Sequence, residues 1–265
     1  MPFTLSHAAA SLPFRRLKPV WPALVIGTFA PDLQYFILLS DEDRSGHYFP
    51  EVLLFTLPVA LLVLWLFEWI VKRPVLELLP SSVQRRLQDK AEPLSFSGWR
   101  QFGLSVLWTV VGIATHLGWD QFTHSYSELA MRWGILRAIV PLPLGHTINF
   151  AHLLQHISTV GGMVVLAVWF VAWYRRTSPA APSGDEFSPQ LKIGLPLAMV
   201  VIAALIAYPI ATLRLASHVQ PVKPLHLVVT IFEATTLAFC VELLVYGLTL
   251  TMSAYLRRAS AALAD

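Results

Sequence analysis

Long apolar runs separated by short polar segments dominate the pattern of the chain. Five runs are each made of about 20 or more mostly apolar residues, at residues 49–71, 99–122, 150–174, 193–213 and 225–255. A helix of that length crosses the hydrocarbon core of a bilayer, and it satisfies its own backbone hydrogen bonds there. The pattern therefore predicts an all-α, polytopic membrane bundle with five spans.

Composition favours the same class over a soluble helical domain. Hydrophobic residues make up 55% of the chain and charged residues only 13%, and the mean hydropathy is +0.60. Such a chain has too little polar surface to coat a soluble particle of its size. The net charge of +3 comes from basic residues that flank the runs and suit anionic lipid headgroups. We expect the lipid bilayer as a partner and, without a basic stripe, no nucleic acid.

The positions of Lys and Arg assign the two sides of the membrane. Basic residues flank the end of the first run, the end of the third and the end of the fifth, including Lys72, Arg73, Arg175, Arg176 and Arg257. The positive-inside rule makes these ends cytoplasmic, together with the C-terminus and the loops at residues 74–97 and 178–189. The segment from His124 to Asn149 then lies on the outer side. No boundary marks off a soluble domain, so residues 1–265 are expected to form a single membrane-embedded domain.

The N-terminal segment, residues 1–40, allows two interpretations. Residues 19–39 are long enough to span, and Arg15 and Arg16 before them favour a sixth span with the N-terminus inside. A re-entrant or interfacial segment is the alternative, because helix-breaking or charged residues interrupt the run, namely Pro22, Gly27, Pro31 and Asp32.

Ionisable residues cluster where membrane spans normally exclude them. His116, Asp120 and His124 follow one another at intervals of four residues, and so do His152 and His156 at the start of the third span. Residues four apart share one face of a helix, and both stripes fall at the outer side in the topology above. His and Asp are ligands for zinc or a similar divalent ion. The sequence therefore predicts a metal site, with hydrogen-bonded polar pairs between helices as the simpler alternative.

Further polar residues are candidates for the same site or for another role. His47 and His146 fall on the outer side. Glu233 on the last span and His146 are weaker candidates beside the metal site, and Arg132 and Arg137 are candidates for holding a phosphate. Glu68, in contrast, is expected to pair with Lys72 one helical turn away.

Three motifs together resemble a known family. They are the opening Met-Pro-Phe-Thr-Leu-Ser-His7-Ala-Ala-Ala, the Gly27-Thr-Phe-Ala-Pro-Asp32 motif and the His116-x3-Asp120-x2-Thr-His124 motif. The chain resembles an uncharacterised family of bacterial membrane proteins (domain of unknown function 4184). That family is similar to predicted inner-membrane metal-dependent hydrolases and, more distantly, to zinc-dependent phospholipase C.

The resemblance implies a set of metal ligands and a location. Its ligands fall on His7, Asp32, His47, His116, Asp120, His124 and His152, and His156 stands where the phospholipase pattern has Glu. It implies one to three zinc ions, with Asp32 as a bridging group and general base, in the bacterial cytoplasmic (inner) membrane. If His7 joins the site, residues 19–39 do not cross the membrane fully.

We expect a membrane-embedded, metal-dependent hydrolase with its site at the outer face. The substrate class is a phosphoester or a lipid headgroup, and Asp32 or Asp120 would orient the attacking water. The alternative is a non-catalytic metal-binding protein or a metal-ion transporter, so an enzyme is favoured but not required. Haem ligation is disfavoured, because Asp120 stands between His116 and His124.

Overall fold

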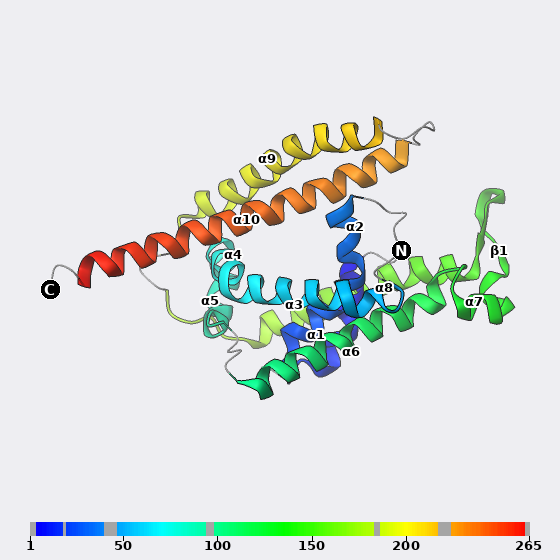
Figure 1. Ribbon diagram of the computed structural model, residues 1–265, viewed down its shortest axis with the longest axis horizontal. Helices are drawn as coiled ribbons and strands as arrows, with labels where there is room; N and C mark the ends of the chain where they lie inside the picture. The colour runs from blue at the N-terminus through cyan, green and yellow to red at the C-terminus, as the bar shows by residue number, and fades with distance from the viewer. Residues whose placement is uncertain are drawn as a thin grey trace. The chain divides into compact units, whose positions relative to one another are not determined.

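A computed structural model describes residues 4–17, 20–39, 47–93, 98–182, 186–216 and 224–262 (Figure 1). Within these ranges the regular structure is helical apart from two short strands. Five helices are long and apolar enough to cross a membrane: Val52–Leu78, Trp99–Arg132, Phe150–Arg176, Pro189–Ala216 and His226–Arg257. They coincide with the five predicted runs. The chain is therefore an all-α, multi-pass membrane protein, as the sequence predicted.

The chain packs as two compact units. The first comprises Met1–Leu33, Arg44–Leu64 and Ser95–Arg176, and the second comprises Gln34–Asp43, Trp65–Leu94 and Thr177–Asp265. Each unit is discontinuous in sequence. Every residue of the candidate metal cluster described below belongs to the first unit.

Short helices from the N-terminus pack onto two long spans in the first unit. The short ones are η1 (Thr4–Phe14), α1 (Trp21–Gly27) and η2 (Ala30–Asp32), and the long ones are α6 (Trp99–Thr123) and α8 (Phe150–Arg176). Ala30, Ile113 of α6 and Ala60 of α3 (Leu57–Leu66) form a buried core between them. A second core of Ala130, Leu136 and Ala151 fixes the start of α8.

The backbones of α1 and α6 touch at two glycines. A Cβ on Gly112 would lie 2.4 Å from the carbonyl oxygen of Leu24 and 2.7 Å from the Cα of Gly27, and one on Gly27 would lie 2.3 Å from the carbonyl oxygen of Thr109. Neither position can take a larger residue without moving a helix. This contact sets α1 and the residues that follow it directly against α6.

The ambiguous segment at residues 19–39 is broken into short helices where it is described. After the 7-residue α1 come η2 and the 6-residue α2 (Leu33–Leu38), and none of these reaches the length of a span. Pro22 stands at the start of α1 and Pro31 at the start of η2, positions where a missing N–H costs nothing. The N-terminal helix η1 lies instead against α8, where a Cβ on Gly162 would meet the Cβ of Ser6 at 2.8 Å.

A small antiparallel hairpin joins α6 to α8. It follows α7 (Glu128–Arg132) and η7 (Gly134–Arg137), and it consists of β1 (Ile139–Pro141), η8 (Pro143–Gly145) and β2 (Thr147–Asn149). Ile139 pairs with Asn149 and Pro141 with Thr147. Leu144 and Gly145 at the tip have positive φ, which closes the turn tightly.

In the second unit, two long helices pack along a stripe of small residues. Figure 1 shows α9 (Pro189–Ala216) and α10 (Pro224–Ala262) side by side. Met199, Ala203, Ala207 and Ala211 are buried at every fourth position of α9. Small residues at this spacing let membrane helices approach closely.

Residues 74–97, expected as a loop, contain helices where they are described. They include most of α4 (Lys72–Leu78), all of α5 (Ser81–Leu87) and η6 (Gln88–Lys90). Buried Lys192 of α9 donates to the hydroxyl of Ser81 at 2.8 Å and to Gln84, so α5 is tied to a span. In η5 (Phe67–Val71) Glu68 accepts from Lys72 at 2.7 Å, which confirms the predicted pair.

Gly112→Ala should destabilise the protein, because the new methyl group has no room between α1 and α6. Overpacking costs about 1–3 kcal/mol, which lowers Tm by about 2–4 °C per kcal/mol. Intrinsic tryptophan fluorescence of the protein during heating in detergent measures the effect. Gly103→Ala on the same helix is the control, since its Cβ meets nothing within 4 Å and a better helix former should hold or raise Tm. A Gly112→Ala variant as stable as Gly103→Ala would contradict the helix contact.

Candidate metal centre

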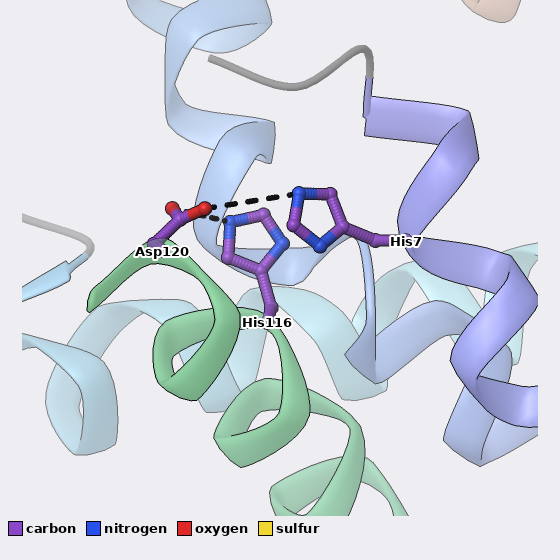
Figure 2. Close-up of side chains that lie close together, drawn as sticks. All are labelled: His7, His116 and Asp120. Atoms are coloured by element: carbon purple, nitrogen blue, oxygen red, sulfur yellow. Dashed lines mark ion pairs between the residues drawn. The ribbon is translucent and has the colours of Figure 1, made fainter. Parts of the chain in front are cut away.

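Six ionisable residues from separate segments gather in the first unit. His7 comes from η1, Asp32 from η2, His47 from the chain before the first span, and His116, Asp120 and His124 from the end of α6. Figure 2 shows His116 and Asp120 projecting from one face of α6 toward His7. His47 is partly buried and the other five are buried.

The two carboxylates share two imidazole rings, those of His47 and His116. Asp120 Oδ2 lies 3.2 Å from His116 Nε2 and 3.5 Å from His47 Nε2, and Asp120 Oδ1 lies 3.8 Å from His7 Nε2. Asp32 Oδ1 lies 3.4 Å from His116 Nε2 and 3.7 Å from His47 Nε2. The cluster is therefore continuous, with His116 at its centre.

Two groups of three in this cluster have the geometry to hold a metal ion. They are His7, His116 and Asp120, and Asp32, His47 and His116, and in each group the potential ligand atoms lie within 4.8 Å of one another. Imidazole nitrogen and carboxylate oxygen are ligands that zinc takes in catalytic sites. Both groups use the same nitrogen of His116.

Neighbouring groups fix which atoms of these side chains face the centre. His116 Nδ1 lies 2.9 Å from the carbonyl oxygen of Thr28, which only accepts, so Nδ1 carries a proton and Nε2 faces the carboxylates. The Thr4 hydroxyl donates to Asp32 Oδ2 at 2.7 Å, which leaves Oδ1 toward the rings. His124 Nδ1 donates to the carbonyl oxygen of Asp120 at 3.1 Å by the same reasoning.

Four buried atoms at the centre have no hydrogen-bond partner: His7 Nε2, Asp32 Oδ1, His116 Nε2 and Asp120 Oδ2. A buried polar atom without a partner costs roughly 1–3 kcal/mol, and more when it is charged. When the His116 ring is neutral, its Nε2 lone pair points at two carboxylate oxygens, which is repulsive unless positive charge lies between them. A proton on one nitrogen satisfies only part of this set. A divalent cation bound by His7, His116 and Asp120, or by Asp32, His47 and His116, would satisfy more of these atoms than a proton can, so the residues present fit a metal.

The two ligands outside the spans have protonation states suited to a cation. Burial, followed by the nearby His116 ring, lowers the pKa of His7 to about 4, so this imidazole is neutral at pH 7. The two rings stack with centroids 4.0 Å apart. Burial raises the pKa of Asp32, but the His116 ring and the Thr4 hydroxyl outweigh it and hold that pKa below its usual range. A neutral imidazole and an ionised carboxylate are the forms that bind metals.

The other candidate residues are placed differently. His152 is half-buried and His156 exposed on α8, and neither belongs to the two metal-binding groups. His146, Arg132 and Arg137 are exposed on the α7 helix and the hairpin region that follows it. Glu233 is buried in α10, in the second unit, and also belongs to neither group.

Several residues that support the centre are ones that sequence reasoning did not single out. Thr4 and Thr28 orient Asp32 and His116, and Gly27 and Gly112 bring their helices together. The signal was partly present, because Thr4 lies in the opening motif and Gly27 and Thr28 in the motif that ends at Asp32. Gly112 lies one helical turn before His116, where nothing in the sequence pattern marks it.

Comparison with known proteins gives a family but no activity. No curated protein and no solved structure matches the chain. One family model matches residues 1–248, which is nearly the whole chain. The chain therefore belongs to the family described as "Domain of unknown function (DUF4184)".

Proposed function

We propose that this protein binds a divalent cation, most simply zinc, in the cluster around His116 and uses it to hydrolyse a phosphoester of a lipid or a related molecule. The observation that carries the proposal is that four buried atoms without hydrogen-bond partners, two nitrogens and two oxygens, belong to residues of the two metal-binding groups. Supporting it, the imidazole and carboxylate donors match those of hydrolytic zinc sites. Softer metals prefer thiolates, and the cluster contains none.

The number of ions is limited by His116. Thr28 occupies its Nδ1, so only Nε2 can bind a metal, and it can bind one ion. His7 and Asp120 complete one group around that nitrogen, and Asp32 and His47 complete the other. A second ion would need a ligand set without His116, with a carboxylate shared between the two ions.

The bound cation would supply Lewis acidity, lowering the pKa of a water from about 15.7 toward about 7 and offsetting charge on the attacked group. We assign Asp32 as the general base that accepts a proton from the attacking water. Its Oδ2 is held by Thr4, and when the ion is bound by His7, His116 and Asp120, the Oδ1 of Asp32 is the atom that would accept the proton. Asp120 lies within 4 Å of the imidazole rings of four histidines, His7, His47, His116 and His124.

The membrane setting narrows the substrate class. His116 and Asp120 lie on a helix long and apolar enough to span, which supports a site that a substrate reaches from the membrane. A substrate that reaches this site from the membrane is a lipid, and its phosphoester lies in the headgroup. The distribution of Lys and Arg supports a site that faces the outer side of the membrane.

Replacing His116 and Asp120 together by Ala should abolish metal binding, because both groups lose their shared nitrogen. Elemental analysis of detergent-purified protein should find zinc, manganese or iron in stoichiometric amount in the wild type and none in the variant. The matched control is His152→Ala/His156→Ala, which removes the two α8 histidines outside the groups and should keep the metal. Metal retained by the first variant, or lost by the control, would contradict the assigned ligands.

Asp32→Asn should lower kcat for phosphoester hydrolysis by about 10²–10⁴-fold, the usual contribution of a general base. Thr4→Val should lower it by about 10–100-fold, because it frees the carboxylate that the hydroxyl orients. Glu128→Gln, an exposed carboxylate on α7, is the control and should leave kcat unchanged. The assay uses zinc-loaded protein with bis(p-nitrophenyl) phosphate and with phospholipid. Stoichiometric metal without turnover of either substrate would instead establish a non-catalytic metal-binding or transport role.

A further inference from the structure

A pocket of about 400 Å³ adjoins the candidate metal centre within the first unit. Its walls come from η1, α6 and α8, and they include His7, Ala10, Trp119, Ile157, Gly161 and Gly162. His7 belongs both to this wall and to the metal-binding group with His116 and Asp120. A molecule in the pocket therefore lies directly beside the metal centre.

The wall of the pocket is mainly apolar and carries almost no charge. Besides His7, its lining consists of Ala, Gly, Ile, Trp and the small hydroxyl residues Ser and Thr. No Lys or Arg is present to hold a phosphate, so the pocket itself does not suit the headgroup of a phosphoester. It suits an uncharged chain, while the cation proposed for the adjoining centre would suit the phosphate.

The rim of the pocket is formed by apolar side chains that face outward from spanning helices. Ile157 of α8 is 57% exposed and Trp119 of α6 is 42% exposed, although both line the pocket. Both residues lie in helices long and apolar enough to cross a membrane. Apolar side chains exposed on such helices contact lipid chains. A lipid chain can therefore enter the pocket sideways from the bilayer, without passing through water.

We propose that this pocket takes a hydrocarbon chain of a lipid phosphoester and so presents the phosphate of that lipid to the metal centre. The proposal rests on the proposed hydrolase function and specifies its substrate as a membrane lipid rather than a soluble phosphoester. The volume is within the range of about 300–1,000 Å³ for small-molecule sites, enough for part of one chain. His7 is the point where the chain-binding wall and the metal-binding group meet.

Glycine at position 161 allows a direct test. A Cβ there meets nothing within 4 Å, so Gly161→Leu fits the helix and its side chain occupies the pocket. The neighbouring Gly162 is unsuitable, because a Cβ there would collide with Ser6. Gly103→Leu on α6 is the control, since its Cβ is equally unobstructed and it is not part of the pocket. Ala10→Leu narrows the same pocket from η1 and provides a second, independent variant.

The experiment uses the zinc-loaded, full-length protein in phosphatidylcholine nanodiscs that contain phosphatidylglycerol with a photoreactive diazirine near the end of one acyl chain. After illumination, mass spectrometry should find the label concentrated at residues 6–10 and 157–162. Gly161→Leu and Ala10→Leu should each reduce this labelling at least fivefold, and Gly103→Leu should not change it. Metal content and Tm, measured on every variant, identify any that fails to fold.

Labelling spread evenly over the outward faces of the spans, and unchanged in both pocket variants, would overturn the proposal. The experiment also tests chain binding in the pocket independently of phosphoester hydrolysis. Pocket labelling without phosphoester hydrolysis would support chain binding and remove the enzymatic function, whereas hydrolysis without pocket labelling would keep the enzyme and overturn chain binding.

Discussion

The contact between α1 and α6 at Gly27 and Gly112 is the constraint on which the candidate centre depends. Thr28 directly follows Gly27, and His116 lies one helical turn after Gly112, so the glycine contact brings the Thr28 carbonyl within 2.9 Å of His116 Nδ1. That hydrogen bond fixes which imidazole nitrogen faces the carboxylates. Asp32 follows in the next turn of chain and reaches the same nitrogen from the other side. A larger residue at either glycine would separate the helices and disturb the hydrogen bond and the ligand geometry together.

The electrostatics of the centre follow from placing two carboxylates among buried imidazoles. Charged side chains within membrane spans are costly unless they are paired or bind an ion. Here one atom of each of Asp32, His116 and His124 has a hydrogen bond to the backbone or to a hydroxyl group. The atoms of Asp32 and His116 that face the centre have no hydrogen-bond partner. Such an arrangement links stability to binding, because a cation that binds only the folded state also stabilises it.

The centre and the adjoining pocket suit the two parts of an amphiphile, its polar headgroup and its apolar chain. Polar side chains of η1, η2 and α6 form the metal-binding groups, while small and apolar side chains of η1, α6 and α8 line the pocket beside them. The short helix η1 contributes to both, since His7 faces the carboxylates and its neighbours face α8. Its close packing on Gly162 holds it in that position. A headgroup and its chain would each find a matching surface without a domain outside the membrane.

The sequence by itself determined the five spans, because their length and apolar character are local properties that need no tertiary contact. It also determined that His116, Asp120 and His124 share a helical stripe, since a spacing of four residues places side chains on one face. The resemblance added His7, Asp32 and His47, which the structure brings to the same cluster. That they bind a metal stays a prediction.

Only the tertiary structure decided which of the two polar stripes, that of α6 or that of α8, forms part of the metal cluster. The two histidines of α8 have the same spacing as the residues of α6, yet His152 and His156 are outside both metal-binding groups. Periodicity fixes which residues share a face, but only packing fixes where that face points, and η1 lies against α8. Residues 19–39 are long enough to span, but the described chain breaks into short helices around Asp32, the alternative that Pro22, Gly27 and Pro31 already indicated. Long-range contacts, above all the helix approach at Gly27 and Gly112, determine where those short helices lie, and the local sequence pattern carries no information about such contacts.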